Sequence, residues 1–177
     1  MGEYINGKES GVFKYYDYAG NIVIKLNYIE AGVKSEVILY YDNGVVKATG
    51  LYVDREKNGI WIYNNLNGEK ISEENYLNDK LNGECIFFYK NGKISEKYNY
   101  LNGLKEGEGY IYYQSGFINM TCNYHMDKLD GDASFYYDDI NQLESKGKYK
   151  MGLKDSVWVF FNEKGEFLRS IDYRKNN

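Results

Sequence analysis

His125 is the only histidine of the 177-residue chain, and it lies close to Asp127 and Asp130. Imidazole and carboxylate groups can bind a divalent metal together, so this segment is the first candidate for chemistry. The spacing in "HMDKLDG" does not match a zinc or calcium motif closely, however. We therefore expect a loop with solvated side chains, and neither a metal site nor another cofactor.

Nucleophilic and acid–base catalysis have little support in this sequence. Any Ser-His-Asp or Cys-His site would have to use His125 as its base. The neighbouring carboxylates Glu73–Glu74 and Asp138–Asp139 would point to opposite faces of a strand. The glycine-containing segments match neither phosphate-binding fingerprint. We expect that the protein is not an enzyme.

A repeat of 24 residues organises nearly the whole chain. One tyrosine recurs in every copy, with a shift of one residue before the last two: Tyr4, Tyr28, Tyr52, Tyr76, Tyr100, Tyr124, Tyr149 and Tyr173. A turn glycine keeps the same step: Gly20, Gly44, Gly68, Gly92, Gly116 and Gly165. Ile140 stands where the sixth glycine is expected, within "DDINQ", and one inserted residue there explains the shift.

Each repeat has the pattern of a β-hairpin. An alternating first strand leads to a three-residue turn such as "KNG", in which glycine takes a left-handed conformation. A second strand follows, and a polar loop such as "LNDKLNG" leads to the next copy. The chain has no proline, so no position forbids ladder hydrogen bonds.

The repeats predict an all-β fold, an elongated and twisted single antiparallel sheet of about seven hairpins. We expect a single repeat domain over residues 1–177, in which residues 1–10 are the remnant of a preceding repeat. A natural N-terminal segment is therefore expected to precede the chain. The hairpins are expected near residues 11–34, 35–58, 59–82, 83–106, 107–130, 131–155 and 156–177.

The two faces of such a sheet differ in residue type. Counted from the first residue of each repeat, offset two holds uncharged residues, and so does offset four, which indicates the buried face. The offset-two residues are Phe13, Val37, Trp61, Cys85, Gly109, Ala133 and Trp158. Cys85 and Cys122 both have this parity, and a separation of about 14 Å across the intervening strands would leave them as free thiols.

The opposite face carries an aromatic row at offset five, interrupted at Asn64. Such a row can stabilise a single-layer sheet through cross-strand pairs, and exposed aromatic residues also mark binding surfaces. The two roles are compatible, so we take the row as the candidate partner-binding site. Its members are Tyr16, Tyr40, Phe88, Tyr112, Tyr136 and Phe161.

The unit "GIWIYNNLNGEKISEENYLNDKLNG" at residues 59–83 resembles the bacterial variant of the MORN repeat, often labelled as a YwqK-type antitoxin family. The resemblance covers essentially the whole chain in seven copies. It implies hairpins without catalysis and a role in binding or scaffolding, and the antitoxin label implies a toxin as partner. This sequence departs from the pattern at Ser35, Gly109 and Ile140, where the local turn geometry is in doubt.

The remaining expectations concern partners and location. The net charge is −4, and acidic and basic residues are interspersed without a basic stripe. We therefore expect a protein partner and no binding of nucleic acid, membranes or small molecules. The alternatives are a glycan-binding module at the cell surface and a simple spacer. Location stays open between the cytoplasm and, if a signal has been removed, the cell surface or periplasm.

Overall fold

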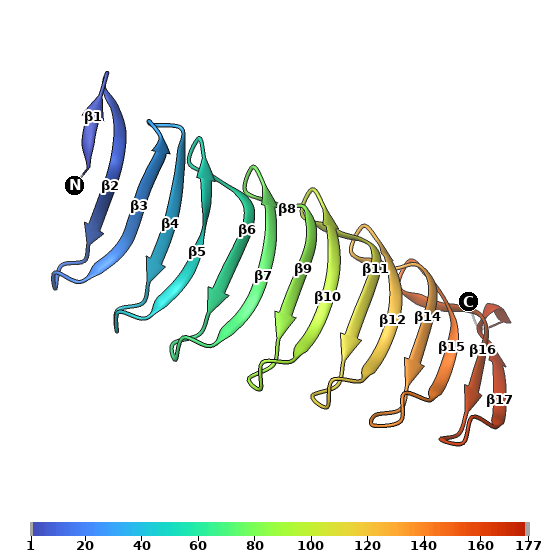
Figure 1. The fold of residues 1–177 in the computed structure, drawn as a ribbon. Helices are drawn as coiled ribbons and strands as arrows, with labels where there is room; N and C mark the ends of the chain where they lie inside the picture. The colour runs from blue at the N-terminus through green and yellow to red at the C-terminus, as the bar shows by residue number, and fades with distance from the viewer. Residues whose placement is uncertain (1, 176–177) are drawn as a thin grey trace. The chain divides into compact units, whose positions relative to one another are not determined.

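The computed structural model describes residues 2–175, and it is all-β apart from one short 3₁₀ turn. Within each of the two units described below, the strands pair antiparallel and form an open sheet, in which consecutive strands along the chain are neighbours (Figure 1). This confirms the predicted fold class of antiparallel β-hairpin repeats. No helix in the described residues is long and apolar enough to cross a membrane.

Contacts divide the chain into two compact units, residues 1–83 and 84–177. The first unit contains β1 (Glu3–Ile5), β2 (Lys8–Tyr16), β3 (Ile22–Glu30), β4 (Lys34–Tyr40), β5 (Val46–Val53), β6 (Glu56–Asn64), β7 (Lys70–Leu77) and β8 (Lys80–Leu81). The second contains β9 (Gly83–Phe88), β10 (Ile94–Leu101), β11 (Leu104–Tyr112), β12 (Ile118–His125), β13 (Lys128–Leu129), β14 (Gly131–Tyr136), β15 (Leu143–Lys150), β16 (Leu153–Phe161), β17 (Phe167–Asp172) and the 3₁₀ turn (Tyr173–Lys175).

The turn within every described hairpin except the sixth has the predicted three-residue form. In the second repeat, Tyr41 N donates to Val45 O at 2.9 Å and Gly44 N donates to Tyr41 O at 2.8 Å. Gly44 has a φ of 81°, a left-handed conformation that costs glycine little. The sixth repeat has a four-residue turn instead, closed by Tyr137 N and Gln142 O, which confirms the insertion inferred near Ile140.

The connection between hairpins is shorter than the sequence indicated. In place of a polar loop, most repeats have a two-residue turn in which both residues have positive φ, as at Asn78–Asp79 and Asn102–Gly103. Such turns match the twist of paired strands, so the strands continue up to them. As a result, the expected repeat boundaries at residues 11, 59 and 107 fall inside β2, β6 and β11.

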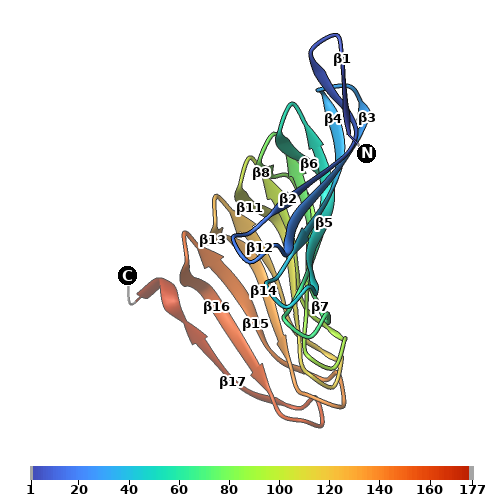
Figure 2. The same ribbon diagram turned by 90° about the vertical axis from the view of Figure 1, so that its left-hand side faces the viewer.

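The buried face is the one that the offset-two residues predicted. Trp61 and Trp158 are completely buried, and Val37, Cys85 and Ala133 are nearly so. A single layer buries an indole by packing it among its neighbours in the sheet. Figure 2 shows the strands in one layer, with no second layer over either face within the described parts of each unit.

Glycines in the preceding strand make room for the large residues. A Cβ on Gly50 would lie 2.2 Å from the Trp61 ring, and a Cβ on Gly147 would lie 2.4 Å from the Trp158 ring. Neither glycine has the positive φ that would require it for backbone reasons, so side-chain space selects it. Each indole Nε1 then donates to the next carbonyl of that strand, Leu51 O at 3.2 Å and Lys148 O at 3.1 Å.

The fifth repeat reverses this arrangement. Gly109 occupies the offset-two position, and Tyr98 of the preceding strand fills the space above it, with its ring 3.0 Å from a Cβ built on Gly109. Tyr98 is buried and makes an edge contact with Tyr124 at 5.5 Å between centroids. The departure at Gly109 is thus an exchange of large and small residues across two strands.

A second set of tyrosines joins successive repeats. Each is the residue that closes a hairpin turn, and its hydroxyl donates to a main-chain carbonyl of the next repeat: Tyr41 to Asn64, Tyr89 to Tyr112, Tyr113 to Tyr136 and Tyr137 to Phe161, at 2.6–2.9 Å. The first lies in residues 1–83 and the other three in residues 84–177. These bonds fix the spacing of the hairpin ends within each unit.

Candidate functional site

The outward side chains of β14–β17 form the candidate site, which we call the C-terminal outer face. Side chains two residues apart share a face of a strand, so each strand contributes alternate residues. They combine apolar, hydroxyl and charged groups: Asp132, Ser134, Tyr136, Lys146, Lys148, Val157, Val159, Phe161 and Leu168.

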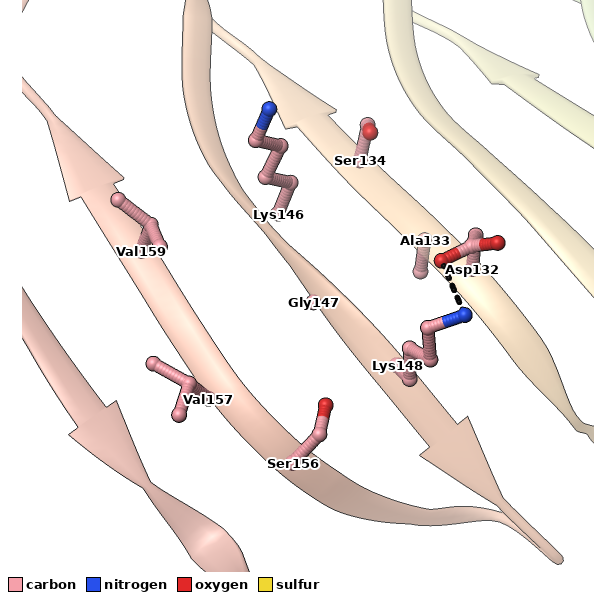
Figure 3. Close-up of a pocket in the computed structure, with 9 residues that line it drawn as sticks. All are labelled: Asp132, Ala133, Ser134, Lys146, Gly147, Lys148, Ser156, Val157 and Val159. Carbon is pink, nitrogen blue, oxygen red and sulfur yellow. Dashed lines mark ion pairs between the residues drawn. The ribbon is translucent and has the colours of Figure 1, made fainter.

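A shallow hollow of about 410 Å³ lies in the middle of this face. Figure 3 shows Lys146 and Lys148 rising from β15 between Ser134 and Asp132 on β14 and the two valines on β16. Lys148 Nζ and Asp132 Oδ1 form an ion pair of 3.1 Å across the strands. Both side chains are more than half exposed, so the pair stabilises the fold little and can exchange for other partners.

The apolar part of the face is exposed on β16 and β17. Val157 is 40% exposed and Leu168 is 57% exposed, while Val159 and Phe161 are half-buried. Apolar residues at the centre with charged residues beside them are typical of protein interfaces. Sequence reasoning missed Val157, Val159 and Leu168 because it considered only the aromatic row, although they have the same outward parity.

The predicted aromatic row is divided between the two units. Tyr16 and Tyr40 lie in residues 1–83, and Phe88, Tyr112, Tyr136 and Phe161 lie in residues 84–177. Tyr16 is 56% exposed and borders a hollow of about 570 Å³ with Val12, Lys14 and Lys25. The other five are half-buried. Their role in binding stays a prediction.

Three of the row residues have main-chain carbonyls that accept the tyrosine bonds between repeats, namely Tyr112, Tyr136 and Phe161. The strand ends that carry these three residues are therefore held in place by a tyrosine of the preceding hairpin. Asn64, where the row is interrupted, also has partners: its side-chain amide donates to Val46 O at 3.1 Å. Asn64 is therefore a half-buried and hydrogen-bonded residue.

The candidates for chemistry occupy ordinary structural positions. His125 Nδ1 lies 3.0 Å from Glu106 Oε1, and this hydrogen bond raises the pKa of His125 and lowers that of Glu106. No group of three or more histidine, cysteine or acidic side chains in residues 2–175 is arranged to hold a metal ion. Cys85 and Cys122 are buried and form no disulfide, as predicted, and burial raises the pKa of Cys122.

Comparison with known proteins agrees with the repeat pattern. The family model of the MORN repeat variant matches three segments of the chain, residues 9–30, 35–54 and 81–102. No curated protein sequence matches the chain significantly. A crystal structure of a protein of unknown function from Bacteroides fragilis NCTC 9343 is 12% identical over 96% of each chain, with a TM-score of 0.13, which is too low to support a shared fold.

Proposed function

We propose that this protein is a non-catalytic scaffold that binds a partner protein through the C-terminal outer face. MORN repeats are in general interaction modules for proteins or membranes, and three segments of this chain match their variant. The observation that carries the proposal is the exposed apolar surface of β16 and β17 beside the aromatic row. Val157 lies outward there in the same hollow as the exchangeable ion pair of Lys148 and Asp132, and Leu168 is exposed on β17.

The expected contact has the anatomy of a protein interface. Tyr136 and Phe161 supply large side chains that lose little rotamer entropy on binding, because the hairpin ends are already fixed. Lys146, Lys148 and Asp132 line the hollow on the same face with both signs of charge, which sets orientation more than affinity. A partner with an apolar centre and mixed charge at its rim fits this surface.

An antitoxin role is the narrower form of the proposal, in which the partner is a toxin that the scaffold neutralises. The resemblance to the antitoxin-labelled family suggests it. A glycan-binding module would present exposed indoles to the sugar rings, but both tryptophans of this protein are completely buried. The buried indoles therefore favour a protein partner over the glycan alternative.

The test is capture of a partner from lysate of the source organism with immobilised protein, followed by identification of what is bound. We expect Tyr136→Ser together with Phe161→Ser to reduce capture at least tenfold, since loss of about 1.4 kcal/mol suffices. The matched control is Tyr16→Ser with Tyr40→Ser, at the same offset in residues 1–83. Equal capture by both double variants would show that the binding surface does not lie on β14–β17.

The antitoxin form has its own readout. If the captured protein inhibits growth when it is expressed alone, co-expression of this scaffold should restore growth, and the Tyr136→Ser/Phe161→Ser variant should not. Capture without any effect on growth would leave a scaffold that is not an antitoxin.

A further inference from the structure

Lysines at one position of alternate repeats lie on the buried face of the sheet, the face that carries Trp61 and Trp158. Lys57, Lys105 and Lys154 each stand two residues before the first residue of a repeat, 48 and 49 residues apart. Lys57 Nζ lies 4.9 Å from the Trp61 ring centroid, 5.3 Å from that of Tyr63 and 4.7 Å from that of Tyr76. The ammonium group thus lies among three rings contributed by β6 and β7.

The seventh repeat has the same arrangement. Lys154 Nζ lies 4.1 Å from the Trp158 ring centroid, 5.7 Å from that of Phe160 and 5.4 Å from that of Tyr173. In the fifth repeat Lys105 lies 3.3 Å from the Tyr98 centroid and 5.1 Å from that of Tyr124. Electron-rich ring faces attract cations, so each of these repeats supplies its own cationic ligand.

The first repeat has the rings of this cage but no lysine. Phe13, Tyr15 and Tyr28 stand at the positions of Trp61, Tyr63 and Tyr76, and Glu9 stands at the position of Lys57. Phe13 and Tyr28 make an edge contact of 5.7 Å between centroids. A cavity of about 330 Å³ opens between these strands, and Glu9, Tyr15, Tyr28 and Tyr52 are among its lining residues.

The carboxylate of Glu9 is well placed to receive a cation. Its side chain is only 19% exposed, and within residues 2–175 it forms an ion pair of 3.2 Å with Arg55, whose side chain is 79% exposed. An exposed partner of this kind is easily displaced. Burial and the nearby Glu9 raise the pKa of Tyr28, which agrees with a negative group held among the rings.

We propose that this cavity, bounded by Glu9, Tyr15, Tyr28 and Tyr52, binds an external alkylammonium group of the kind that a lysine side chain carries. The ligand takes the position that the chain's own lysine takes in the third, fifth and seventh repeats. Its ammonium group pairs with Glu9, and its alkyl stem lies along Leu26 and the tyrosine rings. This site lies within residues 1–83, on the face opposite to the outward row, and it does not depend on the proposed partner surface.

The test is an NMR titration of the whole protein with Nα-acetyl-lysine methylamide. We expect saturable shifts of the amide signals of Gly32 and Val33, which line the cavity. The norleucine analogue, which lacks the ammonium group, should bind at least about fivefold more weakly, because a charge-assisted contact is lost. Equal binding of the two probes, or the absence of saturable shifts at these residues, would overturn the proposal.

Variants separate binding from folding. Glu9→Gln should lower the affinity for the lysine probe at least about fivefold. Glu36→Gln, which removes a carboxylate on the opposite face, should leave this affinity unchanged. Arg55→Ser removes the competing cation and should tighten binding about two- to fivefold, a gain that misfolding cannot produce. Glu9→Lys with Arg55→Ser should fill the cage from within and abolish binding. Unchanged affinity in Glu9→Gln or in the Glu9→Lys double variant would refute the assignment.

Discussion

Replacing Gly50 by alanine is the sharpest test of the packing on the buried face. The new Cβ would lie 2.2, 2.3 and 2.6 Å from three ring atoms of Trp61. Carbon atoms in contact are normally about 3.5–4.0 Å apart, so the ring would have to move by about 1.3 Å. Trp61 is completely buried and its Nε1 is bonded to Leu51 O at 3.2 Å, so the displacement strains the packing and this bond together.

The expected cost follows from these two effects. Overpacking costs about 1–3 kcal/mol, and weakening a hydrogen bond adds about 0.5–1.5 kcal/mol. Alanine also lowers the conformational entropy of the unfolded chain, and this stabilises the folded protein by about 0.4–1 kcal/mol. We expect a net loss of about 2–3 kcal/mol in the free energy of unfolding, measured by urea titration with circular dichroism.

A second background identifies the cause. In a Trp61→Ala protein the obstructing ring is absent, so Gly50→Ala should cost nothing or stabilise slightly. Gly109→Ala, whose Cβ would meet ring atoms at 2.9–3.0 Å, should cost less than Gly50→Ala in the natural background. A Gly50→Ala loss below about 0.5 kcal/mol, or one of equal size with and without Trp61, would refute the reasoning.

Four further predictions concern stability and shape. Trp61→Ala should cost about 3–5 kcal/mol, against about 1 kcal/mol for Asn64→Ala, which loses the bond to Val46 O; equal losses in urea titrations would contradict the assignment of the two faces. Tyr113→Phe should cost about 0.5–1.5 kcal/mol in thermal melts by removing its bond to Tyr136 O, whereas Tyr18→Phe, at a fully exposed position, should cost nothing measurable. Burial raises the pKa of Tyr52 and Tyr98, and that of Tyr124 to about 12, so their stabilising contribution is complete below the unfolded pKa near 10 and decreases as the pH rises above it; a melting temperature that stays constant from pH 9 to 12 would contradict this. The elongated sheet expected from seven hairpins should give a radius of gyration above about 19 Å in small-angle scattering, against about 16 Å for a globular chain of this length.

The sequence predicted the fold class and the identity of the buried face because both depend on simple periods. The 24-residue step located the hairpin turns, and alternation along each strand placed Trp61, Val37 and Trp158 in the buried face. The insertion near Ile140 followed from a shift in the tyrosine series. These features depend on local chemistry that one repeat already contains.

Features that depend on two adjacent repeats were not predicted. Gly50 pairs a small residue with the large Trp61 of the next strand, and in Tyr98 and Gly109 the large residue comes first. This pairing is visible only when neighbouring strands are compared. The bonds from Tyr113 and its equivalents cross 23 or 24 residues of chain to a carbonyl, which has no side-chain signature. Longer strands were missed because Asn-Asp and Met-Asp pairs form two-residue turns here without glycine.

The candidate site was predicted only in part. The aromatic row lies on the outward parity, but the apolar residues that extend it, Val157 and Leu168, come from rows that vary in type between repeats. The lysines of the aromatic cages had a detectable signal, since Lys57 and Lys105 recur at twice the repeat length. A search at 48 residues would have found them and singled out Glu9.

The proposal of a partner-binding outer face is tested most directly by hydrogen exchange of the protein alone and in complex with its captured partner. We predict that amides of β14–β17 exchange at least tenfold more slowly in the complex, while those of β2–β5 keep their rates. Slowed exchange in β2–β5 with unchanged rates in β14–β17 would contradict the account and place the partner on the first unit.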